Sequence, residues 1–161
     1  MKDFTNQRPE SFNYQGNWID NDWMSNFTRC RIVHEGIEYP SVENFYQAMK
    51  TLNPELRKGV AQMSASHAKR WGRRTELRSD WEKMKVSIML TGLALKFSQE
   101  PFKTQLINSN PDELIEWNNW GDRFWGVDIS DNKGHNMLGE CLKLVRLNLL
   151  TMEGLQQKLD I

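Results

Sequence analysis

Residues 40–50 of the chain read Pro40-Ser41-Val42-Glu43-Asn44-Phe45-Tyr46-Gln47-Ala48-Met49-Lys50. Pro40 ends an extended segment, Ser is a common helix cap, and no Gly or Pro follows before Pro54, so these residues predict a helix that begins at Ser41. At about 100° per residue, one apolar face is formed by Val42, Phe45, Met49 and Leu52. The helix is therefore expected to pack against the core.

Glu43 and Lys50 lie at the border of this apolar face. They are seven residues apart, which places them within about 20° of each other around the helix. Two turns span roughly 10 Å, too long for a direct ion pair, but Lys50 leans toward the helix N-terminus and hence toward Glu43. The pair predicts the wall of a pocket that holds a small ligand. The alternative is a partly buried helix whose border charges are solvated.

Length and composition predict one compact domain. The chain has 161 residues, 39% of them hydrophobic, which is enough for one core. Residues 1–16 are polar and without periodicity, so we expect a loosely ordered N-terminal segment followed by a single domain over residues 17–161.

The charge is balanced overall but uneven along the chain. Twenty-one basic residues balance twenty-one acidic ones, so the protein has no general attraction for polyanions. Residues 67–85 nevertheless carry a net charge of +4, and residues 110–131 carry −5. Any contact with nucleic acid is therefore expected to be local.

Cysteine usage and the N-terminus predict a cytoplasmic protein. Cys30 and Cys141 are far apart and lack C-x-x-C spacing, so neither a zinc site nor a disulfide framework is indicated. The chain begins without an apolar signal core, and no run approaches the length of a membrane span. The three histidines have no metal-ligand spacing and are assigned no catalytic part.

The remaining periodicity predicts mostly helices. Two short strands, residues 29–33 and 37–39, read as a hairpin separated by His34-Glu35-Gly36. Ser79 and Glu82 predict a capping box for a long core helix over about residues 80–97. Further helices are expected over residues 55–63, 66–73, 101–107 and 136–152, and a strand over residues 114–117. Residues 117–139 are polar and rich in tryptophan, which is typical of a functional loop.

Seven separated motifs resemble the NADAR family of YbiA-like N-glycosidases over roughly residues 17–150. They are Ser25-Asn26-Phe27, Ser41-x-Glu43-x-x-Tyr46-Gln47-x-x-Lys50, Gly72-Arg73, Trp81, Lys96-Phe97-x-Gln99, Asp122-x-x-Trp125-Gly126 and Asn136-x-Leu138-Gly139. One departure is the presence of both Trp120-Gly121-Asp122 and Trp125-Gly126-Val127-Asp128. Asp122-x-x-Trp125-Gly126 is placed on the family motif, which leaves the roles of Trp120 and Asp128 open.

The resemblance implies a compact α+β domain, mostly helical with a small sheet, that hydrolyses an N-glycosidic bond between a ribose-like sugar and a base. The substrate classes that it implies are ribosylamino-pyrimidine intermediates of riboflavin biosynthesis and ADP-ribose attached to guanine in nucleic acid. The expected partner is thus a ribosyl or ADP-ribosyl molecule, free or attached to DNA or RNA. No cofactor, metal, membrane or obligate protein partner is expected.

Breaking a C1′–N bond builds positive charge on the ribose, which a nearby carboxylate stabilises while it activates water. Glu43 is the candidate for this role. Lys50 is expected either to hold a phosphate or hydroxyl, or to attack C1′ of a ring-opened sugar if burial lowers its pKa. Asp122 is expected to anchor ribose hydroxyls or to assist protonation of the leaving base.

Eight further residues are predicted to bind the substrate: Asn26, Phe27, Tyr46, Arg70, Arg73, Trp125, Gly126 and Asn136. Each has an alternative explanation. Arg70 and Arg73 can belong to a solvated face, while Asp122 and Asn136 can cap a turn and a helix. The alternative function is an ADP-ribose or nucleotide-binding module without turnover. Glu43 and Lys50 together favour the enzyme, because a binder of phosphorylated ligands gains little from a nearby carboxylate.

Overall fold

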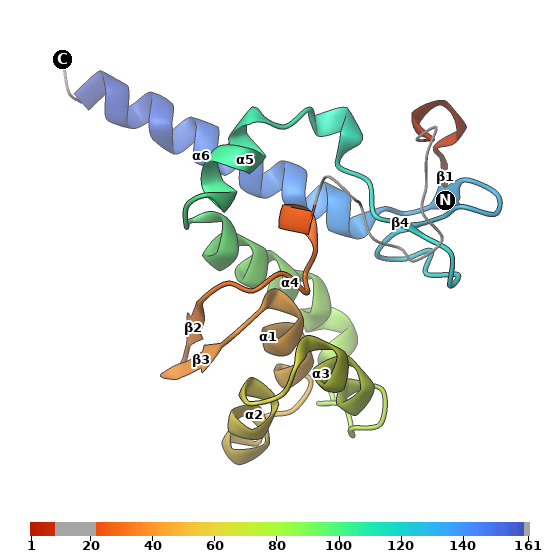
Figure 1. The fold of residues 1–161 in the computed structure, drawn as a ribbon, viewed down its shortest axis with the longest axis vertical. Coiled ribbons are helices and arrows are strands. Elements are labelled where there is room, and N and C mark those ends of the chain that lie inside the picture. The colour runs from red at the N-terminus through yellow and green to blue at the C-terminus, as the bar shows by residue number, and fades with distance from the viewer. Residues whose placement is uncertain (9–21, 160–161) are drawn as a thin grey trace. The chain divides into compact units, whose positions relative to one another are not determined.

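The computed structural model describes residues 1–8 and 22–159 (Figure 1). Most of these residues are helical and the strands form two small sheets, so the predicted α+β fold class is confirmed. Contacts divide the chain into two compact units, Trp23–Glu100 and Met1–Asp22 with Pro101–Ile161. We call them the central unit and the terminal unit, after their positions in the sequence. The single domain over residues 17–161 stays a prediction.

The central unit begins with a hairpin. Strand β2 (Ile32–His34) pairs antiparallel with β3 (Ile37–Tyr39). Glu35 and Gly36 connect them with φ angles of 49° and 76°, the left-handed conformation that a two-residue hairpin turn requires. The predicted hairpin is confirmed, although its turn is one residue shorter than expected because His34 belongs to the first strand.

Three short helices follow, namely α1 (Val42–Ala48), α2 (Pro54–Ala61) and α3 (Ala65–Gly72). Each has a polar cap at its N-terminus, because the side chains of Ser41, Asn53 and Ser64 accept backbone N–H groups of the first turn. Both α2 and α3 pack against α1, beside the hairpin (Figure 1). The predicted helices over residues 55–63 and 66–73 are confirmed with their ends shifted by one or two residues.

Helix α4 (Trp81–Phe97) is the long core helix of the central unit, as predicted, and it packs against α1 and β2. The predicted capping box is wrong. Asp80 rather than Ser79 is the N-cap residue, and its side chain makes no capping hydrogen bond. Its carboxylate instead accepts from Arg78, with Nη2 2.9 Å from Oδ2, so this ion pair replaces the cap.

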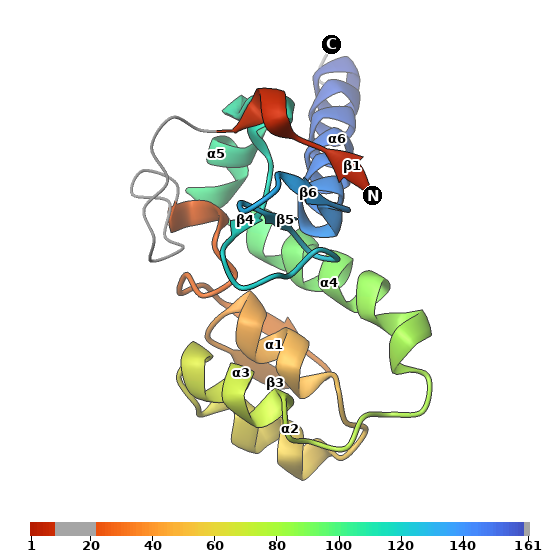
Figure 2. The ribbon, with the colours of Figure 1, turned by 90° about the vertical axis from the view of Figure 1, so that its right-hand side faces the viewer.

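The terminal unit contains a four-stranded sheet in the order β1-β6-β5-β4 (Figure 2). Its strands are β1 (Lys2–Asp3), β4 (Trp117–Asn118), β5 (Val127–Asp128) and β6 (Lys133–Gly134). β4 and β5 are parallel and the other pairs are antiparallel. Beside the sheet, a small buried core is formed by Phe4, Ile115, Trp117 and Val127.

Two helices of the terminal unit, α5 (Phe102–Asn108) and α6 (Met137–Leu159), pack against each other. Arg146 of α6 ties them further, because its Nη2 donates to the Ile107 carbonyl at 2.9 Å. As predicted, Leu138, Leu142 and Val145 of α6 are buried. The helix ends seven residues beyond the predicted end at residue 152. Short 3-10 helices complete the described elements: η1 (Thr5–Gln7), η2 (Asp22–Met24) and η3 (Pro111–Glu113).

Two predicted features of the terminal unit differ from the structure. The strand over residues 114–117 is wrong, because Leu114 and Ile115 follow η3 outside any strand and β4 starts only at Trp117. Of the segment over residues 1–16, the described part is structured. β1 pairs with β6, and Phe4 is 7% exposed against Trp117. Residues 9–16 lie outside the described residues. Within the described part of the chain, no helix has the length and apolar character of a membrane span.

Candidate active site

The predicted site begins at the buried helix α1. Ser41 caps it as predicted, with its Oγ accepting from the Asn44 N–H at 3.0 Å. Every residue of α1 is buried, and Glu43 is only 7% exposed. The helix ends at Ala48, so Lys50 lies just past its last turn, where its N–H donates to the Gln47 carbonyl at 3.2 Å. Glu43 and Lys50 are therefore more deeply enclosed than residues at the border of a surface helix.

Glu43 is held through its side chain and through its backbone. Gln47, one turn later, donates from Nε2 to Glu43 Oε1 at 2.8 Å, and the Glu43 N–H donates to the Asn26 carbonyl at 2.9 Å. Burial is the dominant influence on the carboxylate and raises its pKa, while the Gln47 hydrogen bond and the charges of Lys69, Lys50 and Arg73 oppose that rise. A carboxylate with a raised pKa can take up and release a proton closer to neutral pH.

Lys50 lies in an aromatic surrounding. Its Nζ donates to the Gly72 carbonyl at 2.8 Å and lies 6.0 Å from the Tyr46 ring centroid and 5.7 Å from that of Trp81. Burial lowers the Lys50 pKa as predicted, Glu43 opposes this change, and the nearby cations Arg73 and Lys69 reinforce it. A lowered pKa increases the fraction of neutral amine, which is the nucleophilic form.

Gly72 is the point where α3 meets both functional side chains. Besides its bond to Lys50, a Cβ on Gly72 would lie 1.8 Å from Gln47 Oε1, so no larger residue fits without displacing Gln47. Since Gln47 orients Glu43, the close approach of α3 to α1 sets the positions of the carboxylate and the amine together.

The loop that precedes the hairpin forms another side of the site. Lys96 of α4 is completely buried and donates from Nζ to the Ser25 carbonyl at 2.7 Å, which anchors the loop. Asn26 contributes its backbone carbonyl to Glu43, and its Nδ2 lies 3.5 Å from Met89 Sδ. Phe27 is 42% exposed, with Lys69 Nζ 5.4 Å from its ring centroid. An exposed ring beside a cation is suited to contact a base.

The two predicted substrate-binding arginines lie in different surroundings. Arg73 is exposed, and its charge acts on both Glu43 and Lys50. Arg70 is also exposed, but it lines a hollow of about 420 Å³ together with Trp71 and other residues of α3 and its flanks. A second hollow of about 380 Å³ is lined by residues that include Phe27 and Ser41. Neither hollow includes Glu43 or Lys50 in its lining.

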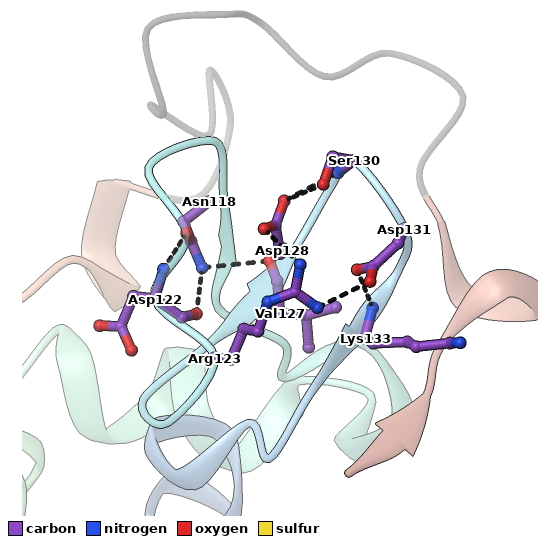
Figure 3. Close-up of polar contacts among 8 residues, drawn as sticks. All are labelled: Asn118, Asp122, Arg123, Val127, Asp128, Ser130, Asp131 and Lys133. Atoms are coloured by element: carbon purple, nitrogen blue, oxygen red, sulfur yellow. Dashed lines mark hydrogen bonds and ion pairs between the residues drawn. The ribbon is translucent and has the colours of Figure 1, made fainter.

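The remaining predicted site residues belong to the terminal unit. Asp122 Oδ1 accepts from the N–H groups of Phe124 and Trp125 at 3.0 and 2.9 Å, which is the turn-capping alternative. Asn118 fixes the same loop by donating from Nδ2 to the carbonyls of Asp122 and Val127 (Figure 3). The Trp125 ring packs edge-on against that of Phe124 at 5.0 Å.

Gly126 and Asn136 are buried within the terminal unit. A Cβ on Gly126 would lie 2.2 Å from the Glu116 carbonyl oxygen, so only Gly fits there. Asn136 is completely buried, with Oδ1 accepting from the Glu116 N–H and Nδ2 donating to the Leu114 carbonyl, both at 3.0 Å. Asn136 therefore holds the chain ahead of β4 in place. Its contact with substrate stays a prediction.

The two residues whose roles were left open by sequence also belong to this loop. Asp128 is buried in β5 and pairs with Arg123, whose Nη2 lies 3.0 Å from Oδ2, while Arg123 Nη1 reaches Asp131 at 2.7 Å (Figure 3). Ser130 donates both its N–H and its hydroxyl to Asp128 Oδ1, which lowers the pKa of this carboxyl. Trp120 is 52% exposed.

The structure thus brings together one part of the predicted site, all of it in the central unit. The charged groups are Glu43, Lys50 and Arg73, and their predicted neighbours are Tyr46 and the Asn26 backbone. Four contributors were not among the predicted site residues. Lys69 was not singled out, and Gln47, Gly72 and Trp81 were named only as positions of the family motifs. Lys69 and Arg73 are four residues apart, a spacing that places them on the same side of a helix, but their pairing with Glu43 depends on how α3 packs on α1.

This arrangement, a buried carboxylate and a desolvated lysine in an α+β fold, is typical of an enzyme active site. A sequence model of the NADAR domain matches residues 3–150. N-glycosidase YbiA of Escherichia coli is 33% identical over 130 residues, covering 78% of this chain and 80% of the relative. The NMR structure of the E. coli protein YbiA covers 84% of this chain and 82% of its own, with 30% identity and a TM-score of 0.67.

A riboflavin biosynthesis protein of Vibrio vulnificus is 35% identical over 131 residues, which cover 79% of this chain and 35% of that protein. The chain belongs to the NADAR family. It is an enzyme of the N-glycosidase class, a hydrolase that acts on N-glycosyl compounds.

Proposed function

We propose that the protein hydrolyses the bond between C1′ of a ribose and a nitrogen base, where the ribose is part of ADP-ribose or of a ribose phosphate. The observation that carries this proposal is the Glu43 carboxylate, 7% exposed, oriented by Gln47 and surrounded by Lys50, Lys69 and Arg73. A buried carboxylate stabilises the positive charge that develops at C1′, and the surrounding cations suit a phosphorylated substrate.

Glu43 supports a direct hydrolytic route. Its carboxylate takes a proton from water, the water oxygen attacks C1′, the C1′–N bond breaks, and the leaving base receives a proton. Burial raises the Glu43 pKa, which makes it a stronger base for this step than a solvated carboxylate. Phe27 and Tyr46 supply aromatic surface for the base or the sugar.

Lys50 supports a second route through the same groups. Its pKa is lowered by burial, so a neutral amine can attack C1′ of a ring-opened sugar and form an imine as the base leaves. Water then hydrolyses the imine, and Glu43 carries the protons that ring opening and hydrolysis require. Asp122 stays a candidate for ribose binding or leaving-group protonation.

The test uses one substrate of each proposed class. They are ADP-ribose on guanine in an oligonucleotide and a ribosylamino-pyrimidine phosphate. The experiment incubates the enzyme with each and identifies the products by mass spectrometry. Release of the free base from at least one substrate is expected, and its absence from Glu43→Gln reactions is the control for contaminating hydrolases. Binding of ADP-ribose by the wild type without any base release would favour the alternative, a non-catalytic nucleotide-binding module.

The imine route is tested by adding sodium cyanoborohydride to the reaction. A sugar adduct on the peptide that contains Lys50, together with an inactive Lys50→Arg variant, would support it, because arginine keeps the charge but forms no imine. Lys58→Arg is the matched control, since Lys58 is an exposed lysine of α2 paired with Glu55. An active Lys50→Arg variant without an adduct would leave Lys50 as a binding residue and Glu43 acting on water.

A cytoplasmic location is also part of the proposal. Cys30 and Cys141 are both free thiols in the described structure, as expected of a protein in a reducing compartment. Fractionation of the source cells followed by detection with an antibody would test it.

A further inference from the structure

Helix α3 carries a second row of functional side chains that the reaction above does not use. His67, Arg70 and Trp71 of α3 and Arg74, two residues past its end, follow the spacing i, i+3, i+4, i+7, which places them on one side of the helix. Together with Met63 and Thr75 they line a hollow of about 420 Å³. This volume lies within the range of small-molecule binding sites.

The two arginines of this hollow are exposed. Within residues 1–8 and 22–159, the structure gives neither the Arg70 nor the Arg74 guanidinium a carboxylate partner. Other arginines are paired, such as Arg31 with Glu38 at 2.9 Å and Arg57 with Glu35 at 2.6 Å. Two guanidinium groups four residues apart without counter-charges are suited to bind phosphates, because each offers a planar pair of donors.

The hollow also has an apolar wall. Trp71 and Met63 are both partly exposed, and Trp71 is the aromatic residue of the lining. An accessible indole in the same hollow as two arginines combines a stacking surface with phosphate donors, the two elements that single-stranded nucleic-acid sites share. A base must be unstacked to lie on the indole, which favours a single strand over a duplex.

We propose that this hollow binds a single-stranded nucleic acid, with one base stacked on Trp71 and the flanking phosphates bound by Arg70 and Arg74. The chain has no net charge, so this attraction is local to the basic segment over residues 67–85. Lys69 and Arg73 directly precede Arg70 and Arg74 in the sequence, and their charges oppose the rise of the Glu43 pKa. Helix α3 and the residues after it thus carry two pairs of cations. Lys69 and Arg73 influence the carboxylate, and Arg70 and Arg74 bind the nucleic acid.

In this way the hollow would hold the strand whose ribosylated base enters the active site. This catalytic consequence rests on the proposed function, but the binding itself does not require turnover. An unmodified oligonucleotide therefore tests the hollow independently of the N-glycosidase reaction.

The experiment measures fluorescence anisotropy of a short fluorescein-labelled single-stranded oligonucleotide over a series of KCl concentrations. The variant Arg70→Ala/Arg74→Ala is expected to bind at least about 10-fold more weakly at low salt. It should also flatten the slope of log affinity against log salt by about 1.4, because single strands contribute about 0.7 per phosphate contacted. Trp71→Ala should weaken binding by about 10-fold and leave that slope unchanged, since stacking involves no counterion release.

The matched control is Arg31→Ala/Lys58→Ala, which removes two exposed positive charges from the same unit but outside the hollow. It should bind like the wild type. The proposal would be overturned by an equal loss in this control, by wild-type affinity in the Arg70/Arg74 variant, or by equal affinity for a duplex of the same sequence. Circular dichroism and the unfolding midpoint of each variant exclude loss of fold as the cause.

Glu43→Gln separates this inference from the proposed function. It should bind the unmodified oligonucleotide with wild-type affinity while losing base release from a ribosylated substrate. If the wild-type enzyme releases base but binds no oligonucleotide, only the proposal that the hollow binds nucleic acid is rejected. If it binds the oligonucleotide but releases base from no substrate, only the proposed N-glycosidase reaction is rejected.

Discussion

Glu43 of α1 and the polar side chains of the loop over residues 117–139 are held in different ways. In the loop, Asn118 and Asn136 use both ends of their amides on backbone groups, and Asp122 accepts two N–H groups. In α1, the buried Glu43 has a pKa raised by burial despite its neighbouring cations. Polar groups satisfied by backbone stabilise the fold, whereas a carboxylate kept in a surrounding that disfavours its charge indicates catalysis.

The largest effect is expected at Glu43. Glu43→Gln keeps a hydrogen-bonding group of the same shape beside Gln47 but removes the negative charge that stabilises the cationic transition state. We expect kcat to fall by about 10²-fold or more with the fold intact. Steady-state rates and circular dichroism check this. Glu55→Gln, at an exposed position of α2, is the matched control. Near-normal turnover in Glu43→Gln would remove Glu43 from the catalytic role.

Asn136→Ala should instead affect stability. It removes two buried hydrogen bonds and places Ala at a φ of 51°, so we expect a loss of about 2–4 kcal/mol in the free energy of unfolding. Urea unfolding measures it. Asn136→Gly tolerates the backbone conformation and should lose only the hydrogen-bond part. A variant as stable as the wild type but with a raised KM would contradict this and support the substrate contact predicted from sequence.

A smaller effect is expected at Asp122. Asp122→Asn retains the Oδ1 acceptor for Phe124 and Trp125, so stability should change by no more than about 0.5 kcal/mol and kcat by only a few fold. Asp122→Ala lacks the acceptor and should lose about 1 kcal/mol. If Asp122→Asn loses about as much kcat as Glu43→Gln, the carboxylate is catalytic, as the sequence predicted, and the contrast between the two regions fails for this residue.

The smallest effect is the pH dependence of stability. Because the Glu43 pKa is raised above 4.5 in the folded state, folded protein retains this proton at pH values where unfolded protein has lost it. The stability of the wild type relative to Glu43→Gln should therefore be highest below pH 4.5 and fall as pH rises through the raised pKa. Urea midpoints of both proteins across this range measure the difference. A difference that grows with pH would mean that the surrounding cations outweigh burial.

Sequence predicted the local elements of the central unit well because their signals are local. Ser41 and the apolar spacing of Val42, Phe45 and Met49 define α1 and its C-cap, and the Glu35-Gly36 turn defines the hairpin. Leu52, predicted on the same apolar face, instead lies past the end of α1 and is 63% exposed. The capping box failed because Asp80 pairs with Arg78, two residues away, rather than with the helix. The strand over residues 114–117 failed because β4 is defined by its parallel partner β5, which a local pattern does not reveal.

The candidate site was predicted where chemistry follows from residue type and missed where it follows from packing. Glu43, Lys50 and Arg73 lie together, and the expected decrease of the Lys50 pKa is present. Gln47 and Gly72 were missed as site residues because their importance arises only when α3 approaches α1 closely enough to leave no room for a Cβ. The spacing of residues within α1 or within α3 does not predict the distance between the two helices.

The pairing of β1 with β6 has a consequence for folding during synthesis. Lys2 lies opposite Gly134 in the sheet, so the first strand has no partner until more than 130 residues have been made. At ribosomal rates this delay lasts on the order of ten seconds. The central unit, continuous from Trp23 to Glu100, is complete in sequence well before that. The active-site carboxylate can therefore be enclosed by its own helices while β1 is still unpaired.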